Sequence, residues 1–172
     1  MIAINASDVD EDVILHGGFE RFQPDSTTRM LKQGPWWEEI YARSYVSRVF
    51  VHRVMGLNWI FLTDAQYEKE KTIAIAKIDS CLDRFQQLCD ENHIRCTFVF
   101  HPIAIEITRH KYEGQPVVDY ALSKHYDVIN LYQYFLAQGV NEKNIKNYFW
   151  LTDLHNTNLG YRVFAQGLKT DF

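Results

Sequence analysis

The clearest pattern of apolar and polar positions lies between residues 64 and 92. Apolar residues recur there at spacings of three and four, while charged side chains fill most of the positions between them. The recurring residues are Ile75, Ile78, Leu82, Phe85 and Cys89. This spacing predicts one long amphipathic helix with a single buried stripe. Thr63 and Gln66 form the capping-box pair that marks the start of such a helix.

Short apolar runs elsewhere in the chain indicate buried strands. Residues 96–100 and 127–131 each form such a run, and residues 2–6 open the chain with another. Helices are expected over residues 36–55, 117–124 and 159–168, and residues 132–138 are helical or irregular. The alternation of strands with helices predicts a layered α/β fold with a mainly parallel sheet.

Composition and charge narrow the class of protein. The chain has 172 residues, of which 47% are hydrophobic and 23% charged, so we expect one soluble domain with a helical insertion at about residues 24–60. The net charge of −4 argues against a nucleic-acid partner, and no apolar run reaches the roughly 18 residues of a membrane span. Cys81, Cys89 and Cys96 lack metal-ligand or disulfide spacing and are interpreted as small buried apolar side chains.

The most informative motif for chemistry is Asp153-Leu154-His155, in a polar stretch ahead of the final helix. An Asp and a His at this spacing can form two thirds of a hydrolase triad. The imidazole then takes a proton from a nucleophile, and the carboxylate fixes the ring tautomer and stabilises the imidazolium. The spacing alone also fits a loop in which Asp153 and His155 only cap the helix and form local hydrogen bonds.

Together with Gly160-Tyr161 and the alanine-containing helix beyond, this motif resembles the last block of the SGNH (GDSL-like) hydrolases. The one-residue gap between Asp153 and His155 is similar to the branch that acts on exopolysaccharide and cell-envelope glycans. The resemblance implies a three-layer, flavodoxin-like sandwich that here lacks its N-terminal strand or strands. It also implies that His155 is the general base and then the general acid of acyl-enzyme hydrolysis, with Asp153 orienting its ring.

Two further segments are similar to the same family. Residues 2–8 resemble its third block, in which a strand ends at an Asn that stabilises the oxyanion. Ser7 stands in the place of that Asn and Asn5 in the place of a Gly, so the resemblance implies that Ser7 is an oxyanion donor. Alternatively, Ser7 only caps the acidic loop that follows. Residues 98–102 resemble the family's strand that runs into a Pro, and His101 at its end either contacts substrate or is an ordinary strand-end histidine.

The family's nucleophilic serine has no counterpart among the six serines of this chain. None of them stands in a Gly-Asp-Ser or Gly-x-Ser-x-Gly sequence. One interpretation is therefore the C-terminal part of an esterase or O-acyl hydrolase. Its substrate would be a small-molecule or glycan ester, such as an acylated carbohydrate, its serine would lie outside this sequence, and this chain alone would be inactive. The other interpretation is a non-catalytic binding domain on a degenerate SGNH scaffold.

Neither interpretation implies a metal or an organic cofactor. Exposed strand edges in an incomplete sheet would favour a homo-oligomer. The compartment stays open between the cytoplasm and, if an upstream signal is removed, the cell envelope. Residues 43–53 carry Arg43, Arg48, His52 and Arg53 among aromatic side chains. This tract is compatible with an anionic glycan or a nucleic-acid backbone, although the solvated basic side of a helix is the preferred interpretation.

Overall fold

The computed structural model describes residues 2–4, 8–15, 36–58, 61–150 and 155–169. The chain divides into two compact units. The sheet unit comprises Met1–Ala6 and Ile78–Phe172, and the helical unit comprises Ser7–Lys77. The grouping of all 172 residues into one domain stays a prediction.

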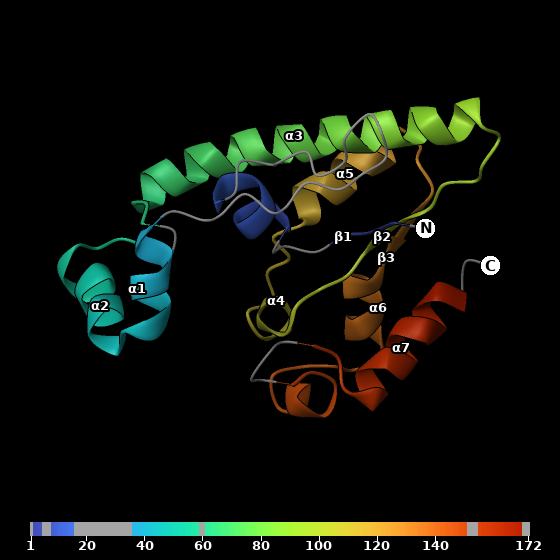
Figure 1. Cartoon of the computed structure of the whole chain (residues 1–172). Helices are drawn as coiled ribbons and strands as arrows, with labels where there is room; N and C mark the ends of the chain where they lie inside the picture. Colours follow the sequence, from blue (N-terminus) through green and yellow to red (C-terminus); the bar gives the residue numbers. More distant parts are fainter. Residues whose placement is uncertain (1, 5–7, 16–35, 59–60, 151–154, 170–172) are drawn as a thin grey trace. The chain divides into compact units, whose positions relative to one another are not determined.

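The described part of the sheet unit contains three strands, β1 (Ile2–Ile4), β2 (Phe98–Phe100) and β3 (Val128–Asn130) (Figure 1). Its helices are α4 (Ala104–Thr108), α5 (Gln115–Ser123), α6 (Leu131–Ala137), the 3-10 helix η3 (Ile145–Asn147) and α7 (Asn158–Lys169). The helical unit contains the π-helix η1 (Asp8–Leu15), α1 (Trp37–Arg43), α2 (Tyr45–Val49) and the π-helix η2 (Phe50–Val54). Helix α3 (Asp64–Glu91) runs from the helical unit into the sheet unit.

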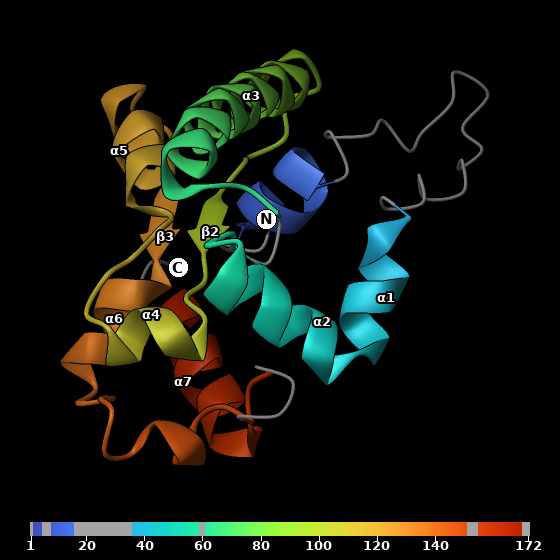
Figure 2. The ribbon, with the colours of Figure 1, turned by 90° about the vertical axis from the view of Figure 1, so that its left-hand side faces the viewer.

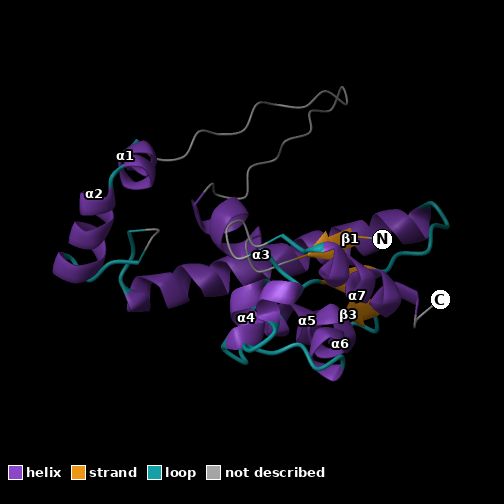
Figure 3. Ribbon diagram, turned by 90° about the horizontal axis from the view of Figure 1, so that it is seen from below, coloured by secondary structure: helices purple, strands orange, loops and turns teal. Residues whose placement is uncertain are grey.

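The three strands form one parallel sheet in the order β1-β2-β3, with strands drawn in orange in Figure 3. Ile4 is in register with Phe100, and Phe100 with Asn130, so the carboxyl ends of the strands meet at one edge. Every residue of the central strand β2 is buried, as expected of a continuous apolar run in a parallel sheet. The predicted α/β fold with a parallel sheet is confirmed at this level.

Helices lie on two sides of the strands. In both Figure 1 and Figure 2, α5 and the part of α3 within the sheet unit lie above the strands, whereas α6 and α7 lie below them. The carboxylate of Asp83 on α3 accepts hydrogen bonds from the hydroxyls of Tyr120 (2.8 Å) and Tyr126 (2.7 Å). These bonds join α3 to α5 and to the loop before β3. On the other side, Gly167 of α7 packs closely against Leu131 of α6.

Helix α3 follows the sequence prediction closely. The backbone N–H of Gln66 donates to Oγ1 of Thr63 (3.3 Å), and the backbone N–H of Thr63 donates to Oε1 of Gln66 (3.0 Å). The predicted capping box is therefore confirmed.

Leu82 and Cys89 are buried as the stripe of α3 predicts, but Phe85, which has the same spacing, is 47% exposed. Cys96 is buried as expected, whereas Cys81 is exposed because it lies outside the buried stripe of α3.

Residues 36–55 form consecutive short helices rather than the single helix that the sequence predicts. At Ser44 the backbone is extended (φ −114°, ψ 111°), which ends α1 and begins α2. Oγ of Ser44 accepts a hydrogen bond from the backbone N–H of Ser47 (3.2 Å). The prediction is wrong at this residue because a serine hydroxyl can replace a backbone acceptor and start a new helix.

Helix α4 is absent from the sequence prediction, and it is held by the buried carboxylate of Glu106. This carboxylate accepts hydrogen bonds from the backbone N–H groups of Ile103 (2.8 Å) and Glu113 (2.8 Å). Burial raises the pKa of Glu106, and the backbone hydrogen bonds oppose that rise. The Glu106 carboxylate thus holds the backbone at Ile103 close to the backbone at Glu113. Acidic side chains are more often exposed than buried.

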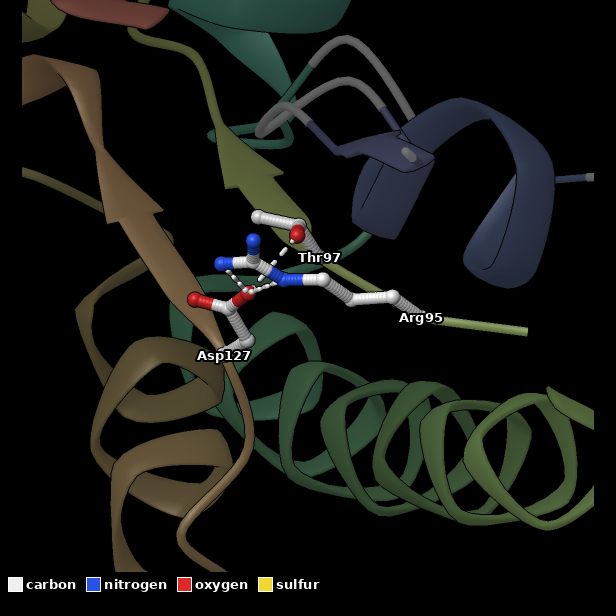
Figure 4. Close-up of polar contacts among 3 residues, drawn as sticks. All are labelled: Arg95, Thr97 and Asp127. Atoms are coloured by element: carbon white, nitrogen blue, oxygen red, sulfur yellow. Dashed lines mark hydrogen bonds and ion pairs between the residues drawn. The ribbon is translucent and has the colours of Figure 1, made fainter. Parts of the chain in front are cut away.

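A polar cluster joins β2 and β3 where these strands begin (Figure 4). Oδ2 of Asp127 accepts hydrogen bonds from Nε (3.1 Å) and Nη2 (2.9 Å) of Arg95 and from Oγ1 of Thr97 (2.8 Å). The backbone N–H of Phe98 donates to the carbonyl oxygen of Asp127 (2.8 Å). One carboxylate thus fixes the amino ends of two neighbouring strands.

Replacing Asp127 with alanine should lower the free energy of unfolding by about 1–3 kcal/mol, because it leaves the buried hydroxyl of Thr97 without this acceptor. Replacing Arg95 with alanine should cost less than about 1 kcal/mol, because that ion pair is largely exposed. Urea unfolding of both variants measures the difference. Equal losses would show that the ion pair, rather than the bond to Thr97, carries the stabilisation.

Candidate functional site

His101 lies at the carboxyl edge of the parallel sheet. It directly follows β2, and its backbone N–H donates to the carbonyl oxygen of Ile4, the last residue of β1 (2.9 Å). Its ring contacts the rings of Phe135, Phe149 and Phe164, with centroids 6.0, 6.2 and 5.3 Å away. This is the edge at which ligands bind in open parallel α/β sheets.

The side chain of His101 is joined to the buried side chain of Asn156. Nδ2 of Asn156 lies 3.0 Å from Nε2 of His101. Because an amide nitrogen only donates, Nε2 accepts this bond, and the neutral ring carries its proton on Nδ1. Burial lowers the pKa of His101 to about 4, so the ring is neutral at pH 7. The hydrogen bond to His101 therefore holds Asn156, the residue after His155, at the edge of the sheet.

The loop that carries His155 is closed at its base by backbone hydrogen bonds. The N–H of Trp150 donates to the carbonyl oxygen of His155 (2.7 Å), and the N–H of Thr157 donates to that of Tyr148 (2.8 Å). Phe149 and Asn156 form the antiparallel bridge between these two bonds. The side chain of His155 itself is exposed. An exposed imidazole on an anchored loop is a suitable arrangement for proton transfer to a ligand.

Thr157 and Gly160 fix the start of α7 against this loop. Oγ1 of Thr157 accepts from the backbone N–H of Gly160 (3.2 Å) and donates to the carbonyl oxygen of Asn147 (2.5 Å). A Cβ atom on Gly160 would collide with the carbonyl oxygen of Tyr148 and lie 3.1 Å from Cβ of Asn156. The absence of a side chain at Gly160 therefore allows the helix and the loop to approach this closely.

The site residues predicted from the sequence fall into two groups. Asp153, Asn5 and Ser7 lie outside the described residues. His155 and His101 are described, and the structure brings His101 together with Asn156, the neighbour of His155. The catalytic roles of all five stay predictions.

Asn156 is the residue of this cluster that sequence reasoning missed. Its Oδ1 atom is buried and has no hydrogen-bond partner among the described residues. The sequence signal that points to Asn156 is its position next to His155. No local pattern in the sequence pairs Asn156 with His101, which lies 55 residues earlier.

The described serines supply no partner for a histidine. Oγ of Ser44 accepts from Ser47, and Oγ of Ser123 donates to the carbonyl oxygen of Tyr120 (2.7 Å). In the described ranges, no serine is hydrogen-bonded to an imidazole, and no three metal-ligating side chains gather at one place. A serine–histidine pair is thus not formed by this part of the chain.

Comparisons with known protein families, curated proteins and solved structures give no significant match to this chain. None of the described helices combines the length and the apolar character needed to cross a bilayer. The functional argument therefore depends on the sequence motif and on the geometry around His155.

The neutral state of His101 should make the protein less stable in acid. Its pKa is lowered from 6.5 to about 4 on folding, so the unfolded chain binds more protons between these values. Full stability is present above pH 6.5, and about 3 kcal/mol of it should be lost as the pH falls to 4. Urea unfolding from pH 7 to pH 4 should show a shallower decline for His101→Gln than for the native chain.

The matched control for this measurement is His110→Asn. His110 is exposed and has a left-handed backbone (φ 51°), which asparagine tolerates. This variant should retain the native pH dependence. A His101→Gln protein that follows the same pH profile as the native chain would mean that His101 does not titrate on unfolding.

Proposed function

We propose that this chain is the C-terminal part of an SGNH-type esterase or O-acyl hydrolase whose nucleophilic serine lies outside these 172 residues. The observation that supports the proposal best is the anchoring of the His155 loop. Asn156 binds His101, which directly follows β2, so the loop is held at the carboxyl edge of a parallel sheet. Catalytic groups of open α/β sheets gather at that edge.

The proposed fold is a three-layer, flavodoxin-like sandwich in which at least one further strand precedes β1 in the sequence. The sequential order β1-β2-β3 and helices on both sides of the strands support it. In the described residues β1 and β3 each pair on one side only, which leaves room for such a strand. Association of two chains through a free edge stays a prediction.

The proposed reaction is hydrolysis through an acyl-enzyme. His155 takes the proton of the serine hydroxyl as the oxygen attacks the acyl carbonyl, and it then passes this proton to the leaving alcohol. A water molecule, deprotonated by the same imidazole, then attacks the acyl-enzyme. The bond between the acyl carbon and the serine oxygen breaks, the imidazolium returns its proton to that oxygen, and the acid is released.

The family resemblance implies that Asp153 orients the ring and that Ser7, with Asn5 two residues before it, donates a hydrogen bond to the oxyanion. The position of His101 at a strand end makes it either a substrate contact or an ordinary strand-end histidine.

The proposed substrate is an acylated carbohydrate. This choice follows from the one-residue spacing of Asp153 and His155, which is similar to the branch acting on extracellular glycans. The exposure of His155 supports a bulky ester, because an imidazole on an open surface can reach a glycan without a deep pocket.

The test compares the 172-residue chain with a protein extended by the coding sequence upstream of Met1. The present chain should not turn over 4-nitrophenyl acetate or acetylated oligosaccharides, because it forms no acyl-enzyme. The extended protein should release acetate and become labelled by a fluorophosphonate on a serine of a Gly-Asp-Ser sequence.

Two outcomes would contradict the proposal. Labelling of a serine within the 172-residue chain, with turnover, would mean that one of its own serines is the nucleophile. An upstream sequence without Gly-Asp-Ser, and no turnover by the extended protein, would favour the non-catalytic binding domain instead.

A further inference from the structure

The helical unit carries a stretch of sequence whose charge differs from that of the rest of the chain. Residues 36–58 contain three arginines, Arg43, Arg48 and Arg53, and two acidic residues, Glu38 and Glu39. With histidine neutral, this stretch carries +1. The whole chain carries −4, so the other residues together carry −5. A partner of this stretch is therefore expected to be anionic.

Helices α1, α2 and η2 surround an open apolar hollow, and the two α-helices are labelled in Figure 2. The hollow has a volume of about 390 Å³. Trp36 and Ile40 line it from the side of α1, and Val46, Phe50 and Met55 line it from the side of α2 and η2. Val46 of α2 and Phe50 at the start of η2, four residues apart, both line the hollow, which fits the spacing of about one helical turn.

The apolar side chains of this segment are unusually exposed. Among the side chains that line the hollow, Trp36 is 80% exposed, Val46 is 76% exposed and Phe50 is 52% exposed. Single exposed apolar residues are common, but a contiguous group of them marks a surface that binds a partner or a membrane. The tryptophan is also typical of side chains at the boundary between lipid and water.

Two of the arginines in this stretch are exposed and available to a ligand. Arg43 forms an exposed ion pair with Glu39 (3.7 Å). Arg48 and Arg53 are exposed, and neither forms an ion pair with a carboxylate in the described ranges. Long arginine side chains can hold their guanidinium groups among lipid phosphates while apolar neighbours lie deeper.

We propose that residues 36–58, the aromatic–basic segment, dock on the surface of an anionic lipid bilayer. The exposed apolar side chains enter the boundary between head groups and acyl chains, and Arg48 and Arg53 bind lipid phosphates. The hollow is also lined by aliphatic Ile40 and Val46, which match lipid acyl chains better than they match nucleotide bases. A second copy of the chain is a poorer match because it brings a second set of positive charges to the same surface.

Sedimentation of the full chain with lipid vesicles tests the proposal. One set of vesicles contains about 30% phosphatidylglycerol in phosphatidylcholine, and the other contains phosphatidylcholine alone. Binding to the anionic vesicles should be at least about tenfold tighter, and it should weaken between roughly 50 and 500 mM salt. This measurement does not involve ester hydrolysis, so its outcome is independent of the proposed function.

Two variants separate the contributions of charge and apolar surface. The double variant Arg48→Glu, Arg53→Glu should lose at least about tenfold in affinity for anionic vesicles. The double variant Val46→Ser, Phe50→Ser should also lose affinity, and because both residues are exposed its helix content should stay native. The matched control is Arg84→Glu, Arg109→Glu, which reverses two exposed charges within the sheet unit and should bind like the native chain.

Several outcomes would overturn the proposal. These are equal binding to neutral and anionic vesicles, absence of binding to both, or an equal loss of affinity in the control variant. A dimer that dissociates in the Val46→Ser, Phe50→Ser variant, without vesicle binding by the native chain, would assign the surface to contact between two copies instead.

Discussion

Replacing His155 with alanine should lower kcat/KM for acetyl esters by at least about 1,000-fold in the extended, serine-containing protein. Without the imidazole, nothing in the proposed site removes the proton of the serine hydroxyl or returns it to the leaving alcohol. The free energy of unfolding should change little, because the His155 side chain is exposed. Steady-state kinetics from pH 5 to pH 9, with a parallel unfolding measurement, separates lost chemistry from lost folding.

The matched control is His125→Asn. His125 is exposed like His155, and its left-handed backbone (φ 60°) is one that asparagine tolerates. This variant should keep native kcat/KM. Ser7→Ala should lower turnover less than His155→Ala does, because one oxyanion donor is worth about 100- to 1,000-fold. Turnover that survives in His155→Ala would remove this residue from the mechanism, whatever the upstream sequence contains.

Replacing Gly160 with alanine should lower the free energy of unfolding by about 2 kcal/mol. In an open helical position this change stabilises by about 1 kcal/mol, because alanine has the higher helix propensity. Here the added Cβ would collide with the carbonyl oxygen of Tyr148. That oxygen belongs to the backbone at the base of the His155 loop and accepts from Thr157, so it cannot move aside without breaking a hydrogen bond.

Gly167→Ala is the matched control, two helical turns further along α7. Its Cβ would meet a methyl group of Leu131 at 2.5 Å, and a flexible side chain can rotate away more easily than a backbone carbonyl can. Thermal and urea unfolding should therefore rank Gly160→Ala as the more destabilised variant. An unchanged or increased stability of Gly160→Ala would show that α7 and the loop are less closely packed than described.

Local sequence patterns were sufficient for helix α3 and for strands β2 and β3. The helix expected over residues 64–92 is observed as α3 (Asp64–Glu91), because its spacing and the Thr63–Gln66 cap act within a few residues. The apolar runs at 96–100 and 127–131 contain β2 and β3, since continuous apolar residues are needed where a parallel strand is covered on both faces. Local spacing also made Asp153 and His155 catalytic candidates, and their roles stay predictions.

Contacts between distant residues decided the rest, and no local pattern encodes them. The sequence does not indicate that Glu106 closes a turn with Glu113, or that His101 binds an asparagine 55 residues away. It also does not indicate which glycine faces a backbone carbonyl, as Gly160 does. Hydrophobic period and capping act over a few residues, whereas these contacts exist only after the strands have paired and α7 has packed.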